Sequence, residues 1–306
     1  MNIFKIPAFV FLAAFLCFST AKGYGKEEVK TAAPIYVGAY SVDHEFGIVT
    51  EECMEILKTK KILYGSRSWG LVIGSYISRQ KDFKTKLTWE GTGNKRVNSK
   101  DMVLTDDVFK EPKILNFIFD SVPKRWQFFD DFIRKEPWSF GKKIDGGLQT
   151  LYYIGDKESM DEAYFPILDG LIRDYPNVKF AISTHNVGAS GTDLRGKEQP
   201  EASDWNVRGG DFSEKVIKKY YGKIAIFDMR DIVSTRPDGT VCSFEHKGKT
   251  YRKLCPEYNS NKDLIHPNTP EAQARMGKGF LILLTKMFCA DKIPRSLVTP
   301  KPDILK

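Results

Sequence analysis

Short apolar segments alternate with segments of helical periodicity along most of the chain. Apolar runs predict five buried strands, at Lys61–Tyr64, Lys86–Trp89, Leu148–Ile154, Val178–Ser183 and Lys223–Asp228. Apolar residues at helical spacing predict helices at Glu51–Lys58, Leu71–Arg79, Asp161–Tyr175, Phe212–Tyr221 and Pro270–Phe288. Strands and helices that alternate in this way form a mostly parallel sheet covered on both faces. The pattern therefore predicts an α/β protein with a mostly parallel five-stranded sheet.

Two stretches do not follow the alternation. Residues 96–147 are rich in aromatic side chains, and we expect them to add helices over the edge of the sheet. Residues 188–210 are rich in Gly and charge and predict a surface loop, and loops of this length are often functional. Because no linker or repeat divides the chain, we expect one domain at 59–290. A lead-in and helix at 22–58 precede it, and a tail at 291–306 follows.

The first 21 residues have the pattern of a secretory signal peptide. Lys5 precedes an apolar run at Ile6–Phe18, and Ser19-Thr20-Ala21 then provides small residues for cleavage. An uncleaved anchor helix is the alternative, although the run is short for a membrane span. We therefore expect a secreted or periplasmic protein with no stable membrane anchor after cleavage.

Export would place the cysteines in an oxidising compartment. Cys242 and Cys255 flank a short segment rich in Gly and Lys, typical of a hairpin, and we expect them to form a disulfide. Cys53 and Cys289 lie in helical patterns and either pair or remain buried thiols. No Cys or His spacing resembles a metal site, so the sequence predicts neither a metal nor a cofactor.

The charge of the chain says little about partners. The 47 Lys and Arg residues exceed the 39 Asp and Glu residues by eight, but no run of five or six basic residues occurs. Dispersed charge of this kind is typical of a solvated surface, and attraction to an anionic glycan or lipid surface is the alternative. Because an exported chain without a basic-aromatic motif is a poor candidate, we expect no nucleic-acid partner.

Polar residues follow each predicted strand, at the edge where ligands bind in parallel sheets. Serine, glycine, asparagine, aspartate and histidine at one edge suit acyl transfer, because they can supply a nucleophile, oxyanion donors, an acid and a base. These residues are Ser66, Arg67, Ser68, Gly91, Gly93, Asn94, Gly155, Asp156, Thr184, His185, Asn186, Asp228 and Arg230, with Asp263 and His266 before the last helix.

Two local motifs stand out. Gly65–Gly70 contains serines between a strand and a helix, where a hydroxyl and its own backbone N–H can face the substrate. A phosphate-binding or purely structural turn is the alternative. In Asp263-Leu264-Ile265-His266, the carboxylate can orient the imidazole toward a serine. A surface Asp beside a structural histidine is the alternative there.

Together these motifs resemble the SGNH (GDSL-like) hydrolase superfamily. The resemblance extends from Lys61 to the final helix and implies a flavodoxin-like three-layer sandwich. It implies Ser68 as nucleophile in a Gly-x-x-Ser-x-Gly variant of the first block, with Asp263 and His266 completing the triad. It also implies that Gly93, followed by Asn94, gives a backbone N–H to the oxyanion. The stretch Ile226–Val233, with Asp238-Gly239 after it, resembles one branch of this superfamily.

The chain departs from the superfamily pattern at two blocks. Gly-Asp-Ser is absent, so Ser66 is the alternative nucleophile, although Trp69-Gly70 after Ser68 favour Ser68. The third block has Gly155-Asp156 and lacks the asparagine that completes the oxyanion site. Either one oxyanion donor is missing, or Asn94 or Asn186 supplies it. Losing one donor typically costs about 100- to 1,000-fold in rate, so a chain without it would be a slow enzyme or a scaffold that only binds.

The resulting hypothesis is an exported serine esterase that cleaves an acyl group from its substrate, and the acyl group we expect is acetyl. Its substrate would be an acylated carbohydrate or another small ester. An acyltransferase needs the same triad and differs only in the acceptor. A non-catalytic glycan- or envelope-binding protein on the same scaffold is the alternative from another class.

Overall fold

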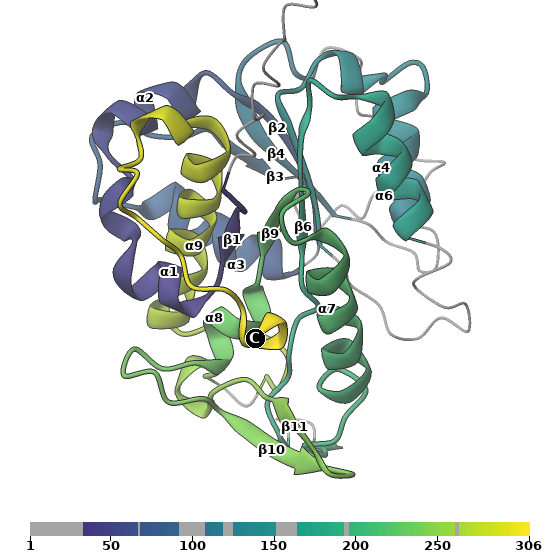
Figure 1. The fold of residues 1–306 in the computed structure, drawn as a ribbon, viewed down its shortest axis with the longest axis vertical. Helices are drawn as coiled ribbons and strands as arrows, with labels where there is room; N and C mark the ends of the chain where they lie inside the picture. Colours follow the sequence, from purple (N-terminus) through teal and green to yellow (C-terminus); the bar gives the residue numbers. More distant parts are fainter. Residues whose placement is uncertain are drawn as a thin grey trace, which may run out of the picture. The chain divides into compact units, whose positions relative to one another are not determined.

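Seven parallel strands form the central sheet, in the order β1-β9-β6-β5-β2-β4-β3 (Figure 1). The computed structural model describes residues 33–66, 68–91, 108–118, 125–150, 164–192, 196–260 and 263–306. The strands are β1 (Tyr36–Val37), β2 (Lys61–Ser66), β3 (Trp89–Gly91), β4 (Lys113–Ile118), β5 (Gly146–Gln149), β6 (Lys179–Ser183) and β9 (Ala225–Phe227). The predicted signal segment at 1–21 lies outside the described residues.

The α/β class and the parallel sheet are confirmed, but the predicted count of five strands is wrong. Strand β1 has only two residues, which is too short for a hydrophobic pattern to reveal. Strand β4 lies within 96–147, where only helices were expected, and Asn116 interrupts its apolar run. A helix, at Arg125–Arg134, is present in this stretch as well. The prediction failed because the aromatic residues of that helix dominated the pattern of the whole stretch.

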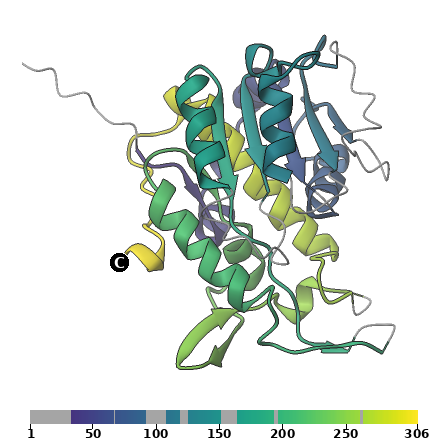
Figure 2. The ribbon, with the colours of Figure 1, turned by 90° about the vertical axis from the view of Figure 1, so that its right-hand side faces the viewer.

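Helices cover both faces of the sheet (Figures 1 and 2). One face packs against α1 (Ala39–His44), α2 (Glu51–Lys58), α3 (Ser68–Arg79), α8 (Met229–Ser234) and α9 (Pro270–Phe288). The other face packs against α4 (Arg125–Arg134), α6 (Phe165–Asp174) and α7 (Val207–Tyr220). Each layer of helices encloses its own apolar core against the sheet. In the described ranges, no helix combines the length and hydropathy needed to cross a bilayer.

Shorter elements complete the described chain. Two small antiparallel pairs lie outside the main sheet, β7 (Gly191–Thr192) with β8 (Glu198–Gln199) and β10 (Ser243–His246) with β11 (Lys249–Arg252). The 3-10 helices are η1 (Phe46–Ile48), η2 (Phe140–Lys142), η3 (Pro256–Tyr258), η4 (Ala290–Lys292) and η5 (Asp303–Leu305).

Helix α9 begins as its sequence predicts. Thr269 caps it by accepting a hydrogen bond from the Ala272 N–H at 3.3 Å, and Pro270 occupies the first turn. Its apolar side then packs on the sheet, where the Phe280 ring lies 5.4 Å from that of Tyr64 and 5.8 Å from that of Trp89.

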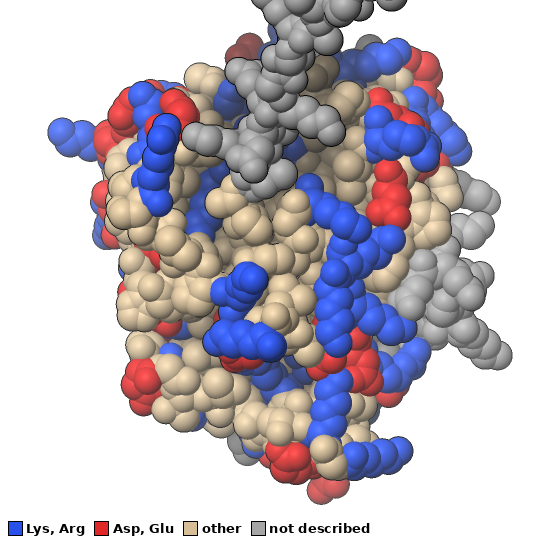
Figure 3. Space-filling model, viewed as in Figure 1, with Lys and Arg blue, Asp and Glu red and all other residues tan. Residues whose placement is uncertain are grey.

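Basic side chains gather over α7 on the face shown in Figure 3, with acidic side chains beside them. Helix α7 carries Arg208, Lys215, Lys218 and Lys219. Lys219 pairs with Asp169 at 2.8 Å, so part of this positive charge is balanced locally.

A buried ion pair joins α9 to the N-terminal part of the domain. Lys286 Nζ donates to Glu45 Oε2 at 2.6 Å and to Thr299 Oγ1 at 2.6 Å, and both charged residues are buried. Thr299 also donates to Glu45 Oε1 at 2.6 Å. Burial lowers the pKa of Lys286, although the carboxylate beside it opposes that shift. The tail at 291–306 is therefore attached to the core through Thr299.

We predict that Lys286→Met destabilises the fold by about 3–5 kcal/mol, because it leaves the Glu45 carboxylate buried without its cation. Urea unfolding measures the change. The double variant Glu45→Gln/Lys286→Met removes both charges and should recover most of the loss. A single variant as stable as the wild type would show that the buried pair contributes nothing.

Candidate active site

The strand-to-helix connection after β2 presents a serine at the edge of the sheet. Strand β2, which lies between β5 and β4 in the sheet, ends at Ser66, and α3 begins at Ser68. The first N–H groups of a helix have no partner within it, so the Ser68 N–H is not used by the helix ladder. Ser68 is partly exposed. A substrate can therefore reach both its hydroxyl and the positive end of the helix dipole.

Ser68, His266 and Asp263 form one hydrogen-bonded row. The Ser68 Oγ lies 2.5 Å from His266 Nε2, and His266 Nδ1 lies 2.6 Å from Asp263 Oδ2. In the imidazole tautomer that carries its proton on Nδ1, His266 donates to Asp263 and accepts from Ser68. This is the geometry by which a carboxylate orients an imidazole as the base for a serine.

The structure distinguishes the two candidate serines. Ser66 is only 1% exposed, and its hydroxyl donates to Asn116 Oδ1 at 2.5 Å. Ser68 is the serine that the imidazole contacts, and it is also the more accessible one. Of the two serines, Ser68 is therefore the one that lies beside the imidazole.

Asn116 is a residue of this region that the sequence did not reveal. It lies on β4, opposite Tyr64 of β2, and is fully buried. Its Nδ2 has no hydrogen-bond partner among the residues that the structure describes. A polar residue inside an apolar run was the available signal. Because the strand itself was missed, that signal could not be used.

Because it has no side chain, Gly70 allows α3 to lie close to the hydrogen-bonded pair Ser66 and Asn116. A Cβ at Gly70 would lie 1.8 Å from Ser66 Oγ and 2.9 Å from both side-chain polar atoms of Asn116. Such distances are far inside van der Waals contact, so glycine is required for the first turn of α3 to lie where it does. The predicted motif thus ends in a glycine for a steric reason.

The other predicted oxyanion residues are not brought to Ser68 by any described contact. Gly93, Asn94 and Asp156 lie outside the described residues, and their roles stay predictions. The strand before Gly93 and Asn94 is β3, which β4 separates from β2.

Asn186 follows β6 and is fully buried, and within the described part of the chain its side-chain amide atoms have no hydrogen-bond partner. Its carbonyl accepts from His185 Nδ1 at 2.7 Å and from Arg230 Nη1 at 3.4 Å. Strand β5 lies between β6 and β2, so the donor role of Asn186 stays a prediction.

The strand-end residues after β6 and β9 belong to a buried polar network. Asp228 accepts from Tyr36 Oη at 2.6 Å and from Thr184 Oγ1 at 2.8 Å. Burial lowers the pKa of Arg230 to about 10, and its guanidinium donates to four backbone carbonyls, those of Asn186, Trp205, Asn206 and Arg252. Strand β9 lies three strands from β2, or about 14 Å. This network therefore holds loops together at a distance from the triad.

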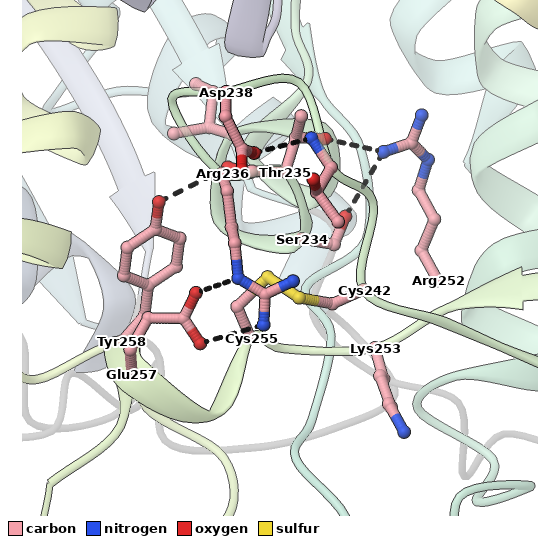
Figure 4. Close-up of a disulfide and its surroundings, with 12 residues drawn as sticks. Ser234, Thr235, Arg236, Asp238, Cys242, Arg252, Lys253, Cys255, Glu257 and Tyr258 are labelled. Carbon is pink, nitrogen blue, oxygen red and sulfur yellow. Dashed lines mark hydrogen bonds and ion pairs between the residues drawn. A yellow bond between two sulfur atoms is a disulfide. The ribbon is translucent and has the colours of Figure 1, made fainter.

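The predicted disulfide between Cys242 and Cys255 is confirmed (Figure 4). Around it, Arg236 Nε donates to Glu257 Oε1 at 2.5 Å and Arg252 Nη1 donates to Thr235 Oγ1 at 2.8 Å. The Cys242–Cys255 disulfide anchors the start of the segment that leads to Asp263.

Cys53 and Cys289 are both buried thiols, and the Cys289 Sγ donates to the Cys53 carbonyl at 3.7 Å. Burial raises the pKa of Cys289 to about 12. Among the described residues, one group of three side chains could offer ligands to a metal, namely Cys242, Cys255 and Glu257. The two sulfurs of that group are bonded to each other.

We predict that Gly70→Ala destabilises the fold by about 1–3 kcal/mol and separates Ser68 from His266, because the new methyl group displaces the first turn of α3. Chemical denaturation measures the first effect and a crystal structure of the variant the second. Gly47→Ala is the matched control, since among the described residues no atom beyond Gly47 and its two chain neighbours lies within 4 Å of a Cβ there. Equal stability of the two variants would contradict the steric argument.

Comparisons with known proteins leave the family open. The chain matches no protein-family profile and no curated protein sequence. Among solved structures, a putative GDSL-like lipase from Parabacteroides merdae is similar over 74% of this chain and 96% of its own, at 13% identity and a TM-score of 0.36. The yeast methylglyoxal/isovaleraldehyde reductase with NADPH is similar over 55% of this chain and 56% of its own, at 11% identity and a TM-score of 0.28. Serine palmitoyltransferase from S. paucimobilis is similar over 85% of this chain and 48% of its own, at 10% identity and a TM-score of 0.27. Likenesses this low do not bear on what the chain does.

Proposed function

We propose that this protein is a serine esterase that removes an acyl group from a carbohydrate or a similar ester. The acyl group that we propose is acetyl. The observation that carries the proposal is the row of Ser68, His266 and Asp263, with Ser68 at the start of the helix that follows β2. The order of the triad along the chain and its resemblance to SGNH (GDSL-like) hydrolases add support. Secretion or export to a periplasm belongs to the same proposal and rests on the N-terminal sequence pattern.

In the first half of the reaction, His266 Nε2 takes the hydroxyl proton as Ser68 Oγ attacks the acyl carbonyl. Asp263 holds the imidazole ring and stabilises its positive charge. The Ser68 N–H at the start of α3 donates to the developing oxyanion, and Gly93, Asn94 or Asn186 supplies the second donor. The oxyanion then collapses, the ester C–O bond breaks, and His266 returns the proton to the departing alcohol.

In the second half, water attacks the acyl-serine carbonyl while His266 accepts its proton. The acid is released and Ser68 recovers its hydrogen. A sugar hydroxyl in place of water would make the same site a transferase, because the triad acts on either acceptor in the same way.

A cavity of the size that holds small molecules lies beside the Asp263–His266 loop, and none of the three triad residues lines it. It has a volume of about 470 Å³, within the usual range for small-molecule sites. Most of its lining is small or polar, comprising Ala189, Ser190, Gly191, Thr192, Lys253, Leu254, Pro256, Asn259 and Leu264.

A non-catalytic glycan-binding or envelope-binding protein is the second candidate. The absence of an asparagine after Gly155-Asp156 favours it, because that residue completes the oxyanion site in the family that the chain resembles. Both candidates predict a small or carbohydrate ligand and no nucleic acid.

We predict that Ser68→Ala abolishes turnover of p-nitrophenyl acetate, by about 1,000-fold or more, because no other group replaces the nucleophile. Ser78→Ala, exposed on the same helix, is the matched control and should retain wild-type rates. A fluorophosphonate probe should label the wild type at Ser68, as identified by peptide mass spectrometry.

Three results would count against the esterase. They are unchanged turnover in folded Ser68→Ala, labelling at another serine, and repeated failure to label a folded wild type. The last result would favour the binding protein.

A further inference from the structure

Every main-chain carbonyl of the loop Asp263–His266 accepts a hydrogen bond. The Asn259 Nδ2 donates to the Asp263 carbonyl at 2.8 Å and to the His266 carbonyl at 2.8 Å. Between them, the Leu264 carbonyl accepts from the Ala189 N–H at 2.7 Å, and the Ile265 carbonyl accepts from the Trp69 Nε1–H at 2.9 Å. Three separate segments of the chain therefore hold one loop of four residues.

The Trp69 bond links the two halves of the triad directly. Trp69 is the residue after Ser68 in α3 and is fully buried. Its indole has one N–H, and that N–H reaches the residue immediately before His266. The helix that carries the serine is thus bonded to the loop that carries the imidazole, next to both functional residues.

The Asn259 bonds set the span of the loop. One amide nitrogen donates to the residues that carry the acid and the base, so it fixes the distance between their backbones. Asn259 follows η3, four residues after Cys255 of the disulfide. The support of the loop is in this way continuous with the disulfide-linked segment.

Side-chain burial does not provide the same restraint. The Asp263 side chain is 43% exposed and that of His266 is 21% exposed, so neither is enclosed on all sides. Their positions depend mainly on where the backbone places them. Because a displacement of about 1 Å in a catalytic group can cost about 100-fold in rate, this backbone support has a direct chemical consequence.

We propose that Trp69 and Asn259 are positioning residues that keep the Asp263–His266 loop in register with Ser68. The proposal rests on the esterase function above. Trp69 acts through the Ile265 carbonyl and Asn259 through two carbonyls of the loop, without contact to the reacting atoms.

The test compares two conservative tryptophan variants. Trp69→Phe keeps an aromatic ring and removes the N–H. Trp126→Phe makes the same change at another buried tryptophan, on α4, whose indole nitrogen has no hydrogen-bond partner in the described ranges. We expect kcat to fall about 10- to 100-fold in Trp69→Phe, with KM within twofold of the wild type. In Trp126→Phe, kcat per folded molecule should be unchanged. Asn259→Ala should resemble Trp69→Phe.

A readout independent of catalysis is hydrogen exchange at the backbone N–H groups of Ile265 and His266. We expect faster exchange there in Trp69→Phe and Asn259→Ala, and wild-type exchange in Trp126→Phe. Equal kcat in Trp69→Phe and Trp126→Phe, together with unchanged exchange, would overturn the proposal. If the wild type hydrolyses no ester, the esterase assignment fails, and the exchange experiment alone still decides whether the two residues hold the loop.

Discussion

The packing of α9 against the sheet and α3 is the interaction on which the rest of the molecule depends. Phe280 lies at its centre with no exposure and contacts aromatic rings from three strands, those of Tyr64, Trp89 and Phe227. Gly277 permits close approach to α3, since a Cβ there would lie 2.1 Å from the Tyr76 ring. Because Ser68 begins α3 and His266 precedes α9, the contact between these helices also fixes the distance between the serine and the imidazole.

Ion pairs hold both ends of α9 in place, and burying their charged side chains costs desolvation free energy. Arg275 binds Asp43 through two hydrogen bonds, of 2.5 and 3.0 Å, and Lys286 binds Glu45 near the other end. Removing such groups from water costs several kcal/mol per ion, which only good geometry offsets. These pairs therefore contribute less net stability than the apolar core, but they specify where α1 and the preceding strand lie along α9.

The sequence was most informative where pattern and chemistry were local. Ser68 and the Asp263–His266 motif could be found because a strand-to-helix serine and an acid three residues from a histidine are short-range signals. The Cys242–Cys255 disulfide was found for the same reason. Strand β1 is too short to show a hydrophobic period, and Asn116 interrupts the apolar run that would have indicated β4. The contacts of Asn116 and Trp69 join residues 50 and 196 positions apart, so no single stretch of sequence encodes them. Asn259 bonds residues only four and seven positions further on, but a lone asparagine outside any motif does not indicate such bonds.

The order of elements along the chain has a consequence for synthesis. Ser68 and His266 are separated by 198 positions, and the helix that covers Tyr64 is also encoded at the end. At about 5–20 residues per second, a ribosome needs about 10–40 s to add the intervening residues. During that time the serine has no imidazole to bond with, and the apolar sheet face that α9 later covers stays open. A nascent chain is thus without its hydrogen-bonded row, and most prone to aggregate, until its last segment emerges.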